Sequence, residues 1–389
     1  MIIRISGMNT VLVLGNGFDL EMGLQTRYQD FYKSGFCPKS YPAPLIFHLN
    51  QKWQDDLEDV KWYDLENELL NYYVSFKKKG EPQDIIDEKE LEYLKKILPY
   101  QISFGVYSEE YGDQIDSLFQ KGIIVRVPLG YAIPYQEDLF LSPIERDKRA
   151  LEMIKKGLCA YLKSLEANPE PPRYCVAFQV FRSLVDSKSE NDTLNIYSFN
   201  YTRVPWGFSS QFDDIFHYVH GDCDKSNLII GTRDEEMAKE YCFLQKAFDR
   251  HFFPPPLVQD LTSADEVIIF GHSLGLNDRQ YFKPFFTAQS SFGSSKPKTI
   301  TIITKDASSV VEVKRSLQQL TDNQLSVLMS RNHVNFVLTD LVYEDGDSLY
   351  EFLLSHGNDS RHSSELLGKI TDWKKDIAAY NEQNTTISQ

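Results

Sequence analysis

The chain has 389 residues, of which 42% are hydrophobic, and this is enough for roughly two to three domains with ordinary cores. Its 56 acidic residues outnumber its 41 basic residues and leave a formal net charge of -15, so we expect no direct nucleic-acid binding. No apolar run reaches the roughly 18 residues of a membrane helix, so we expect no membrane association. The 5 cysteines are scattered and form no CxxC pair, which predicts a cytoplasmic location, where thiols stay reduced, and no structural zinc or other metal.

The first predicted element is an apolar strand over residues 10–14, which runs into a glycine turn and a predicted helix. Gly15 and Gly17 let the backbone turn sharply and approach a ligand closely, and the amides that open a helix attract phosphate. A full dinucleotide fingerprint would have a third glycine where this chain has Leu20, so the turn by itself is a weak signal. It predicts a site for a mononucleotide phosphate.

Between residues 41 and 189 the hydrophobic period changes from two to nearly four, which predicts a helical insertion. Helices are expected over residues 53–76 and 88–98. Another begins at Ser142, because Ser-Pro-Ile-Glu supplies a cap, a proline at the first helical position and a glutamate at the third. The densest basic runs, such as residues 77–79, are short and lie among acidic residues, so we expect solvated helix faces there and no basic patch.

The remaining predicted strands follow in the second half of the chain. They cover residues 194–199, 215–219, 227–230, 266–270, 298–304 and 334–339. Several are almost continuous apolar runs, which suit strands covered on both faces and therefore a parallel sheet. We predict an α/β protein with a Rossmann-like, mostly parallel sheet. Ligands of such sheets bind beyond the carboxyl ends of the strands.

The predicted domains follow from this pattern. Residues 8–40 and 190–345 form a discontinuous Rossmann-like nucleotide-binding domain, and residues 41–189 form the helical insertion. Residues 346–389 form a C-terminal part with one helix around 364–380 and a polar tail.

Four groups of polar residues follow predicted strands and share the predicted crevice. They are residues 15–19, 198–202, 219–221 and 271–278. Each group also has a purely structural interpretation. Asp19 suits a helix cap, Asn200 a turn, and His220 a hydrogen-bonded core histidine.

The order of these groups resembles the bacteriophage abortive infection family AbiH. The shared blocks are GNGFD at 15–19, GL at 23–24, T at 26, YxDF at 28–31, WxDLE at 62–66, SFNYT at 198–202, HG at 220–221 and GHSLxxxDxxYF at 271–282. Several blocks in a fixed order are much more specific than any one of them. The resemblance implies a role in antiphage defence.

The same blocks are similar, more remotely, to the sirtuin-like NAD-binding fold. In that fold a glycine loop binds NAD, an asparagine after a strand and a histidine of an HG pair act on the nicotinamide ribose, and a later GxS segment holds the adenosine half. The resemblance implies catalytic roles for Asn200 and His220. It also implies that the NAD-binding residues are Gly15, Asn16, Gly17, Asp19, Thr202, Gly221, Gly271, Ser273 and Asp278.

This sequence departs from the sirtuin pattern at three points. Asp19 replaces a small hydroxyl residue, Thr202 stands where related NAD-cleaving proteins often carry aspartate, and the zinc-binding cysteines are missing. Protein deacylation is therefore not expected. A carboxylate repels a pyrophosphate unless it points away or meets ribose hydroxyls, so Asp19 constrains NAD binding.

Cleavage of the nicotinamide–ribose bond passes through an oxocarbenium-like state, which needs a polar anchor and a base. We hypothesise that Asn200 positions water or ribose hydroxyls, that His220 takes the proton, and that Glu66 stabilises developing positive charge. An exposed helix glutamate is an equally good interpretation of Glu66. The predicted function is therefore that of an antiphage NAD+ hydrolase. NAD is its substrate or ligand, and its expected partners are a second copy of itself or a phage-derived trigger.

Two alternatives stay open at this level. Residues 271–275 form a literal GxSxG, the nucleophile elbow of serine hydrolases, although the residues after it suggest a loop and a helix cap. The candidate partners downstream of Ser273 are Asp306, Asp340, His356 and His362. The other alternative is a non-catalytic module that senses a nucleotide or binds a partner.

Overall fold

The computed structural model describes residues 7–55, 64–97, 112–127, 130–132, 134–166, 176–203, 215–293, 296–340 and 346–356. Tertiary contacts divide the chain into two units. Unit 1 comprises Met1–Thr26, Leu165–Asp222 and Phe253–Gln389, and unit 2 comprises Arg27–Ser164 and Cys223–Phe252. The helix predicted around residues 364–380 and the polar tail lie outside the described residues.

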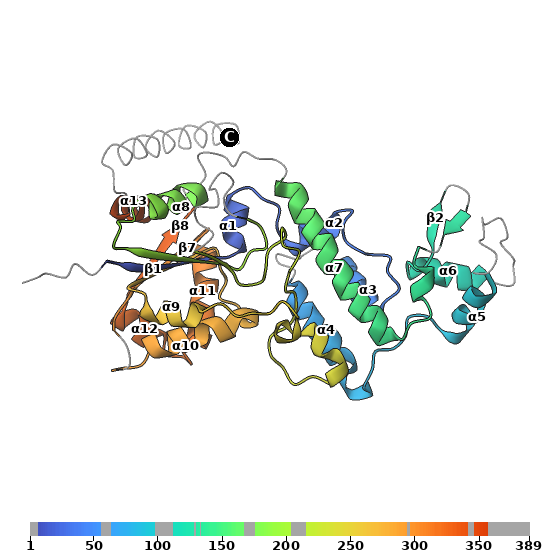
Figure 1. Cartoon of the computed structure of the whole chain (residues 1–389). Coiled ribbons are helices and arrows are strands. Elements are labelled where there is room, and N and C mark those ends of the chain that lie inside the picture. The colour runs from blue at the N-terminus through green and yellow to red at the C-terminus, as the bar shows by residue number, and fades with distance from the viewer. Residues whose placement is uncertain are drawn as a thin grey trace, which may run out of the picture. The chain divides into compact units, whose positions relative to one another are not determined.

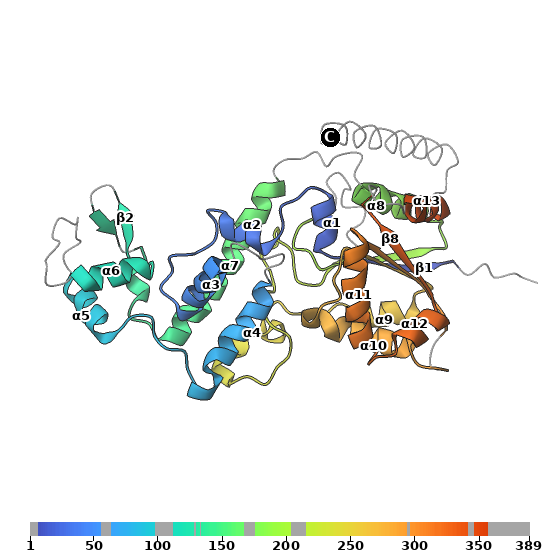
Figure 2. The same cartoon turned by 180° about the vertical axis from the view of Figure 1, so that it is seen from behind.

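Unit 1 is built on a parallel sheet of six described strands. They are β1 (Asn9–Leu14), β4 (Thr193–Ser198), β5 (Phe216–Tyr218), β6 (Glu266–Phe270), β7 (Thr299–Thr304) and β8 (His333–Leu338). Their order across the sheet is β5-β4-β1-β6-β7-β8, and every neighbouring pair is parallel. Figures 1 and 2 show the unit that contains this sheet from opposite sides, with β1 and β8 labelled in both. Numbered within this sheet alone, the strands lie in the order 3-2-1-4-5-6, which is that of doubly wound dinucleotide-binding folds. The predicted Rossmann-like α/β class is confirmed.

Helices cover both faces of this sheet because successive strand residues point to opposite sides. Val11 and Val13 belong to the core formed with α9 (Leu257–Ser263), α10 (Arg279–Gln289), α11 (Ala307–Leu320) and α12 (Leu325–Arg331). Leu12 and Leu14 belong to the opposite core, formed with α1 (Asn16–Glu21), α8 (Val176–Asp186) and α13 (Gly346–Ser355). Figure 1 shows α8 and α13 on one side of the sheet and α9 and α10 on the other. Burial on both faces explains why the strands read as continuous apolar runs.

Unit 2 is mainly helical. Its elements are α2 (Tyr28–Lys33), α3 (Pro44–Asp55), α4 (Leu65–Phe76), η1 (Lys77–Lys79), α5 (Glu88–Ile97), α6 (Gly112–Gln120), the antiparallel pair β2 (Val125–Val127) and β3 (Gly130–Ala132), η4 (Gln136–Asp138), α7 (Pro143–Glu166), η6 (Lys239–Leu244) and η7 (Lys246–Phe248). None of the helices in the described ranges combines the length and apolar composition that crossing a bilayer requires.

Two predicted elements are corrected in unit 2. The prediction of one helix over residues 53–76 is wrong, because α4 begins at Leu65 with the Asp64 carboxylate as its cap. The strand predicted over residues 227–230 is also wrong. Leu228, Ile229 and Ile230 are buried, but they lie in an irregular segment of unit 2.

Helix α7 starts with the predicted capping box. The Ser142 hydroxyl accepts a hydrogen bond from the Glu145 amide at 3.3 Å, and the Glu145 carboxylate accepts one from the Ser142 amide at 3.1 Å. Each side chain thus satisfies a backbone donor that the helix leaves without an internal partner. The sequence signal for this boundary is therefore confirmed.

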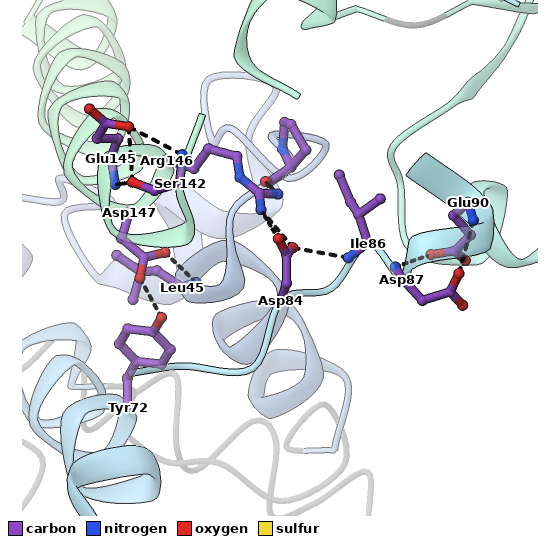
Figure 3. Close-up of polar contacts among 11 residues, drawn as sticks. Leu45, Tyr72, Asp84, Ile86, Asp87, Glu90, Ser142, Glu145, Arg146 and Asp147 are labelled. Atoms are coloured by element: carbon purple, nitrogen blue, oxygen red, sulfur yellow. Dashed lines mark hydrogen bonds and ion pairs between the residues drawn. The ribbon is translucent and has the colours of Figure 1, made fainter. Parts of the chain in front are cut away.

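Two buried ionisable residues of α7 hold neighbouring segments of unit 2 together (Figure 3). The Asp147 carboxylate accepts hydrogen bonds from the Leu45 amide, in the first turn of α3, at 2.9 Å and from the Tyr72 hydroxyl of α4. The Arg146 guanidinium donates to both carboxylate oxygens of Asp84 at 2.6 Å. Because Asp147 is fully buried, both of its contacts form away from solvent.

Candidate functional site

The predicted site residues of unit 1 lie beyond the carboxyl ends of neighbouring strands. Residues 15–19 follow β1, residues 198–202 begin at the end of β4, residues 219–221 follow β5, and residues 271–278 follow β6. Strand β1 lies between β4 and β6, so the strand order reverses direction next to it. In doubly wound sheets this reversal point is where ligands bind. The structure therefore brings these four segments to one edge of the sheet.

The glycine turn after β1 packs directly against the turn after β6. The Gly15 amide donates to the Phe270 carbonyl and the Gly17 amide to the Gly271 carbonyl, both at 2.9 Å. A Cβ atom on Gly17 would lie 2.7 Å from the Gly271 Cα atom, so no larger residue fits without a backbone shift. Close packing of two turns thus accounts for glycine at these positions. The two amides are already used by the protein itself.

Asp19 lies at the centre of the first polar cluster. Its side chain is buried, with 1% exposed, and its Oδ1 atom accepts a hydrogen bond from Asn200 Nδ2 at 2.8 Å. Its Oδ2 atom accepts one from the Thr202 hydroxyl at 2.5 Å. Asn200 Nδ2 also donates to the Gly15 carbonyl at 3.0 Å. The Asp19 carboxylate therefore accepts hydrogen bonds from two donors of the protein. These donors compensate the negative charge that would otherwise repel a pyrophosphate.

These contacts fix the orientation of the Asn200 side-chain amide. A carboxylate and a carbonyl only accept hydrogen bonds, so the atom that faces both must be the amide nitrogen, which has two protons to donate. Both protons are used. The Asn200 Oδ1 atom makes no hydrogen bond within the described residues and is left as an acceptor.

His220 lies in a second cluster that is centred on Asp278. The His220 Nε2 atom is 3.1 Å from Asp278 Oδ1, and the His272 Nε2 atom is 3.4 Å from Asp278 Oδ2. Phe199 packs edge-on against both imidazole rings, with centroid distances of 5.2 Å and 4.4 Å. Since Phe199 directly precedes Asn200, the two clusters are adjacent in the chain. The carboxylate lies within hydrogen-bond distance of His220 and orients its ring.

His272 is the member of this cluster that sequence reasoning missed. Its Nδ1 atom accepts a hydrogen bond from the Leu274 amide at 2.9 Å, so its proton lies on Nε2, facing Asp278. Asp278 was expected to contact a cofactor rather than two histidines. The sequence signal for His272 is its position in the 271–278 group, one residue after Gly271 at the end of a predicted strand.

Four other residues that were predicted to bind NAD also lie in unit 1, outside the hydrogen bonds of the two polar clusters. Asn16 accepts a hydrogen bond from the Thr26 hydroxyl at 2.5 Å. Gly221 is buried with φ at 76°, and Gly271 has φ at 64°. Ser273 is exposed in the loop after β6.

The geometry around Ser273 differs from that of a nucleophile elbow. Such an elbow places a strained serine at a sharp turn from a strand directly into a helix. Here the positive φ of 53° falls on Leu274, and α10 begins only at Arg279. His356 contacts Glu266 at the start of β6, whereas Ser273 follows the end of that strand. His362 lies outside the described residues.

Glu66 belongs to unit 2, in the first turn of α4. It is buried rather than exposed, and its carboxylate lies 2.9 Å from the Lys246 ammonium group, which is buried as well. The pair joins two segments of unit 2 that are distant in sequence. The contact of Glu66 with Lys246 thus connects parts of unit 2. Within the described residues, no group of three or more histidine, cysteine, aspartate or glutamate side chains is arranged to hold a metal ion.

Comparison with known proteins gives one result. A family model described as Bacteriophage abortive infection AbiH matches residues 11–292, well over half of the chain. The matched region includes both polar clusters and Glu66. No curated protein and no solved structure gave a significant match.

Proposed function

This chain belongs to the bacteriophage abortive infection AbiH family, and on that premise we propose that it is an NAD+ hydrolase. Membership of the family implies a role in abortive infection, the defence in which an infected cell fails to support phage growth. The proposal adds a chemical activity to that role. It identifies the substrate as NAD+ and the bond that breaks as the one between nicotinamide and ribose.

One observation carries the proposal. Asn200, held by Asp19, and His220, held by Asp278, follow neighbouring strands at the carboxyl edge of a sheet with the strand order of dinucleotide-binding folds. The Asn200 Oδ1 atom is available to accept a hydrogen bond from a ribose hydroxyl or from water. The site thus offers an oriented acceptor and an oriented imidazole, which are the groups that cleavage through an oxocarbenium-like state requires.

The proposed reaction needs only NAD+ and water as reactants. The ribose C1′–nicotinamide nitrogen bond breaks, and its electron pair leaves with nicotinamide. A water oxygen forms the new bond to C1′, and His220 accepts the proton that this water loses. The products are nicotinamide, ADP-ribose and a proton. Asp278 stabilises the imidazolium that forms, and Asp19 keeps the Asn200 carbonyl oxygen toward the ligand.

Release of nicotinamide from NAD+ by the purified full-length protein tests this proposal. We expect release by the wild type, and a loss of about 100-fold or more in Asn200→Ala and in His220→Ala, since general acid–base groups contribute about 10²- to 10⁴-fold. Asp186→Ala is the matched control and should keep its activity, because Asp186 is an exposed residue of unit 1 outside the proposed site. No release by the wild type, both at rest and with phage-infected cell extract, would refute the activity.

Protection of cells against phage separates the enzyme from a non-catalytic defence module. The same variants are produced in cells and challenged with phage. If the protein acts through hydrolysis, Asn200→Ala and His220→Ala lose protection while Asp186→Ala keeps it. Full protection by the double variant Asn200→Ala/His220→Ala would instead favour a module that acts by binding.

A further inference from the structure

Unit 2 carries a basic hollow that the proposed hydrolase site does not use. It has a volume of about 610 Å³ and lies between one side of α7 and the segment 226–251. Its five basic lining residues are Lys148, Lys155, Lys156, Lys163 and Arg250, and its two acidic ones are Glu152 and Asp249. Because the whole chain carries a charge of -15, this surface reverses the overall sign locally.

Most of the positive charge in this hollow is uncompensated. Both acidic residues pair with the same lysine, since Lys155 Nζ contacts Asp249 and lies 3.3 Å from a Glu152 oxygen. Lys156 and Lys163 have no carboxylate partner in the described part of the chain and are exposed. They can therefore bind an anion without first breaking an ion pair.

The lysines of this hollow are spread in a row along α7. Lys148, Lys155 or Lys156, and Lys163 recur every seven to eight residues, which places them on one side of the helix. At 1.5 Å of rise per residue the row spans about 22 Å. A single phosphate would engage one end of it, whereas an extended polyanion could follow the whole row.

Aromatic rings lie in the same hollow. Phe248 is 62% exposed, which is unusual for so large an apolar side chain in water, and the Phe243 ring lies 5.8 Å from the Lys148 ammonium group. Exposed rings beside a row of cations form the arrangement with which proteins bind single-stranded nucleic acid, since bases stack on the rings while the cations follow the phosphates. An acidic polypeptide would satisfy the lysines but leave the rings without a partner.

We propose that this hollow binds single-stranded nucleic acid. Lys156 and Lys163 bind backbone phosphates, and the Phe248 ring stacks on a base. Stacking on one face of a base requires unpaired bases, so duplex DNA binds more weakly. The proposal is independent of NAD+ hydrolysis, and its residues all belong to unit 2.

The test is fluorescence anisotropy of labelled oligonucleotides with the full-length protein. Single-stranded DNA and RNA of about 16 nucleotides, the upper end of the site sizes seen for single-strand binders, are compared with the same DNA as a duplex and with heparin as a competitor. We expect saturable binding of DNA or RNA single strands at physiological salt, and the stronger of the two arms identifies the preferred sugar.

Two variants and one control separate phosphate binding from base stacking. Lys156→Glu/Lys163→Glu should weaken binding at least tenfold and reduce the salt slope by about 0.7 for each phosphate that is no longer neutralised. Phe248→Ala should weaken binding about tenfold at an unchanged salt slope, as expected when one base has no ring to stack on. Lys77→Glu/Lys78→Glu, which changes the same charge on another exposed surface of unit 2, should bind like the wild type.

Three results would overturn the proposal. One is the absence of saturable binding to any single strand. Another is an equal loss of affinity in the Lys77→Glu/Lys78→Glu control, which would mean that only overall charge matters. The third is unchanged affinity in Phe248→Ala together with complete displacement by heparin, which would reduce the hollow to a general polyanion site. Circular dichroism of each variant verifies that these exposed substitutions leave the fold intact.

Discussion

Asp19 shows at the scale of one residue how a carboxylate can be buried beside the proposed NAD+ site. Both of its oxygens accept hydrogen bonds from the protein, one from Asn200 and one from Thr202. A buried carboxylate is stable only when such donors surround it. The same hydrogen bonds orient Asn200, so structural and functional interpretations of Asp19 are compatible.

The energetic role of Asp19 can be measured by removing its carboxylate. Asp19→Ala leaves the Asn200 amide with one buried donor unsatisfied, so we expect the free energy of unfolding to fall by about 1–3 kcal/mol. Urea denaturation measures it. Asp186→Ala, which removes an exposed carboxylate of unit 1, should change it by at most about 0.5 kcal/mol.

A double-mutant cycle checks that the effect passes through Asn200. If Asp19 and Asn200 stabilise each other, the cost of Asp19→Ala shrinks by about 0.5–3 kcal/mol when Asn200 is already alanine. Additive costs would contradict the coupling, and the proposed orientation of Asn200 would then lose its support.

At the scale of elements, the start of α7 connects α3 and α4 of unit 2 through hydrogen bonds of one buried residue. Asp147 satisfies a backbone donor at the start of α3, where the helix dipole favours negative charge, and it also holds Tyr72 of α4. Burial nevertheless outweighs these interactions and raises the pKa of Asp147 to about 7, from its usual value near 3.8. Helix packing in unit 2 is thereby linked to pH.

The sign of this linkage follows from the two pKa values. Between about pH 4 and pH 7 the folded protein holds a proton on Asp147 that the unfolded chain has released, so unfolding releases a proton and rising pH favours it. The free energy of unfolding should fall as pH rises through this range, by at most about 1.4 kcal/mol per pH unit from this group.

Asp147→Asn provides the matched comparison. It keeps an oxygen for the Leu45 amide, and its amide group can donate to the Tyr72 hydroxyl, but it cannot ionise. We expect the stability difference between wild type and variant to change between about pH 4 and pH 7 and to be constant outside that range. Parallel denaturation curves at every pH would show that Asp147 does not titrate in this window.

The start of α7 and the strands β6 and β7 were predictable because their signals are local. The Ser142–Glu145 box and the apolar runs of β6 and β7 encode their own structure within a few residues. The run at residues 227–230 shows the limit of that logic. A short apolar stretch indicates burial, but whether it pairs with another strand depends on neighbours that the local sequence does not specify.

At the scale of the whole molecule, the features that escaped prediction all depend on distant residues meeting in space. The order of motif blocks indicated which loops share an edge, yet the pairing of His272 and His220 on Asp278 required coordinates. The basic hollow is similar, because its lysines are spread over α7 and no more than two of them are consecutive. Net charge predicts no binding of nucleic acid, and our proposal for the hollow differs because a net charge does not describe a local surface.

Ligand binding to the folded protein gives a prediction at this scale, because any ligand that binds only the folded state raises its stability. The inactive variant His220→Ala should be stabilised by NAD+, by about 2.7 kcal/mol at a concentration 100 times the dissociation constant. Thermal unfolding with and without NAD+ measures it, and the inactive variant prevents consumption of the ligand. His220→Ala/Asn200→Ala should respond less, since it lacks the ribose acceptor.

The lysine variant completes this experiment. His220→Ala combined with Lys156→Glu/Lys163→Glu should keep the full NAD+ response, because these lysines line the hollow of unit 2 and lie outside the nucleotide site that we propose in unit 1. Loss of the response would mean that NAD+ binds in the basic hollow through its pyrophosphate. The hydrolase site would then have to be sought in unit 2, and the polar clusters around Asp19 and Asp278 would be structural.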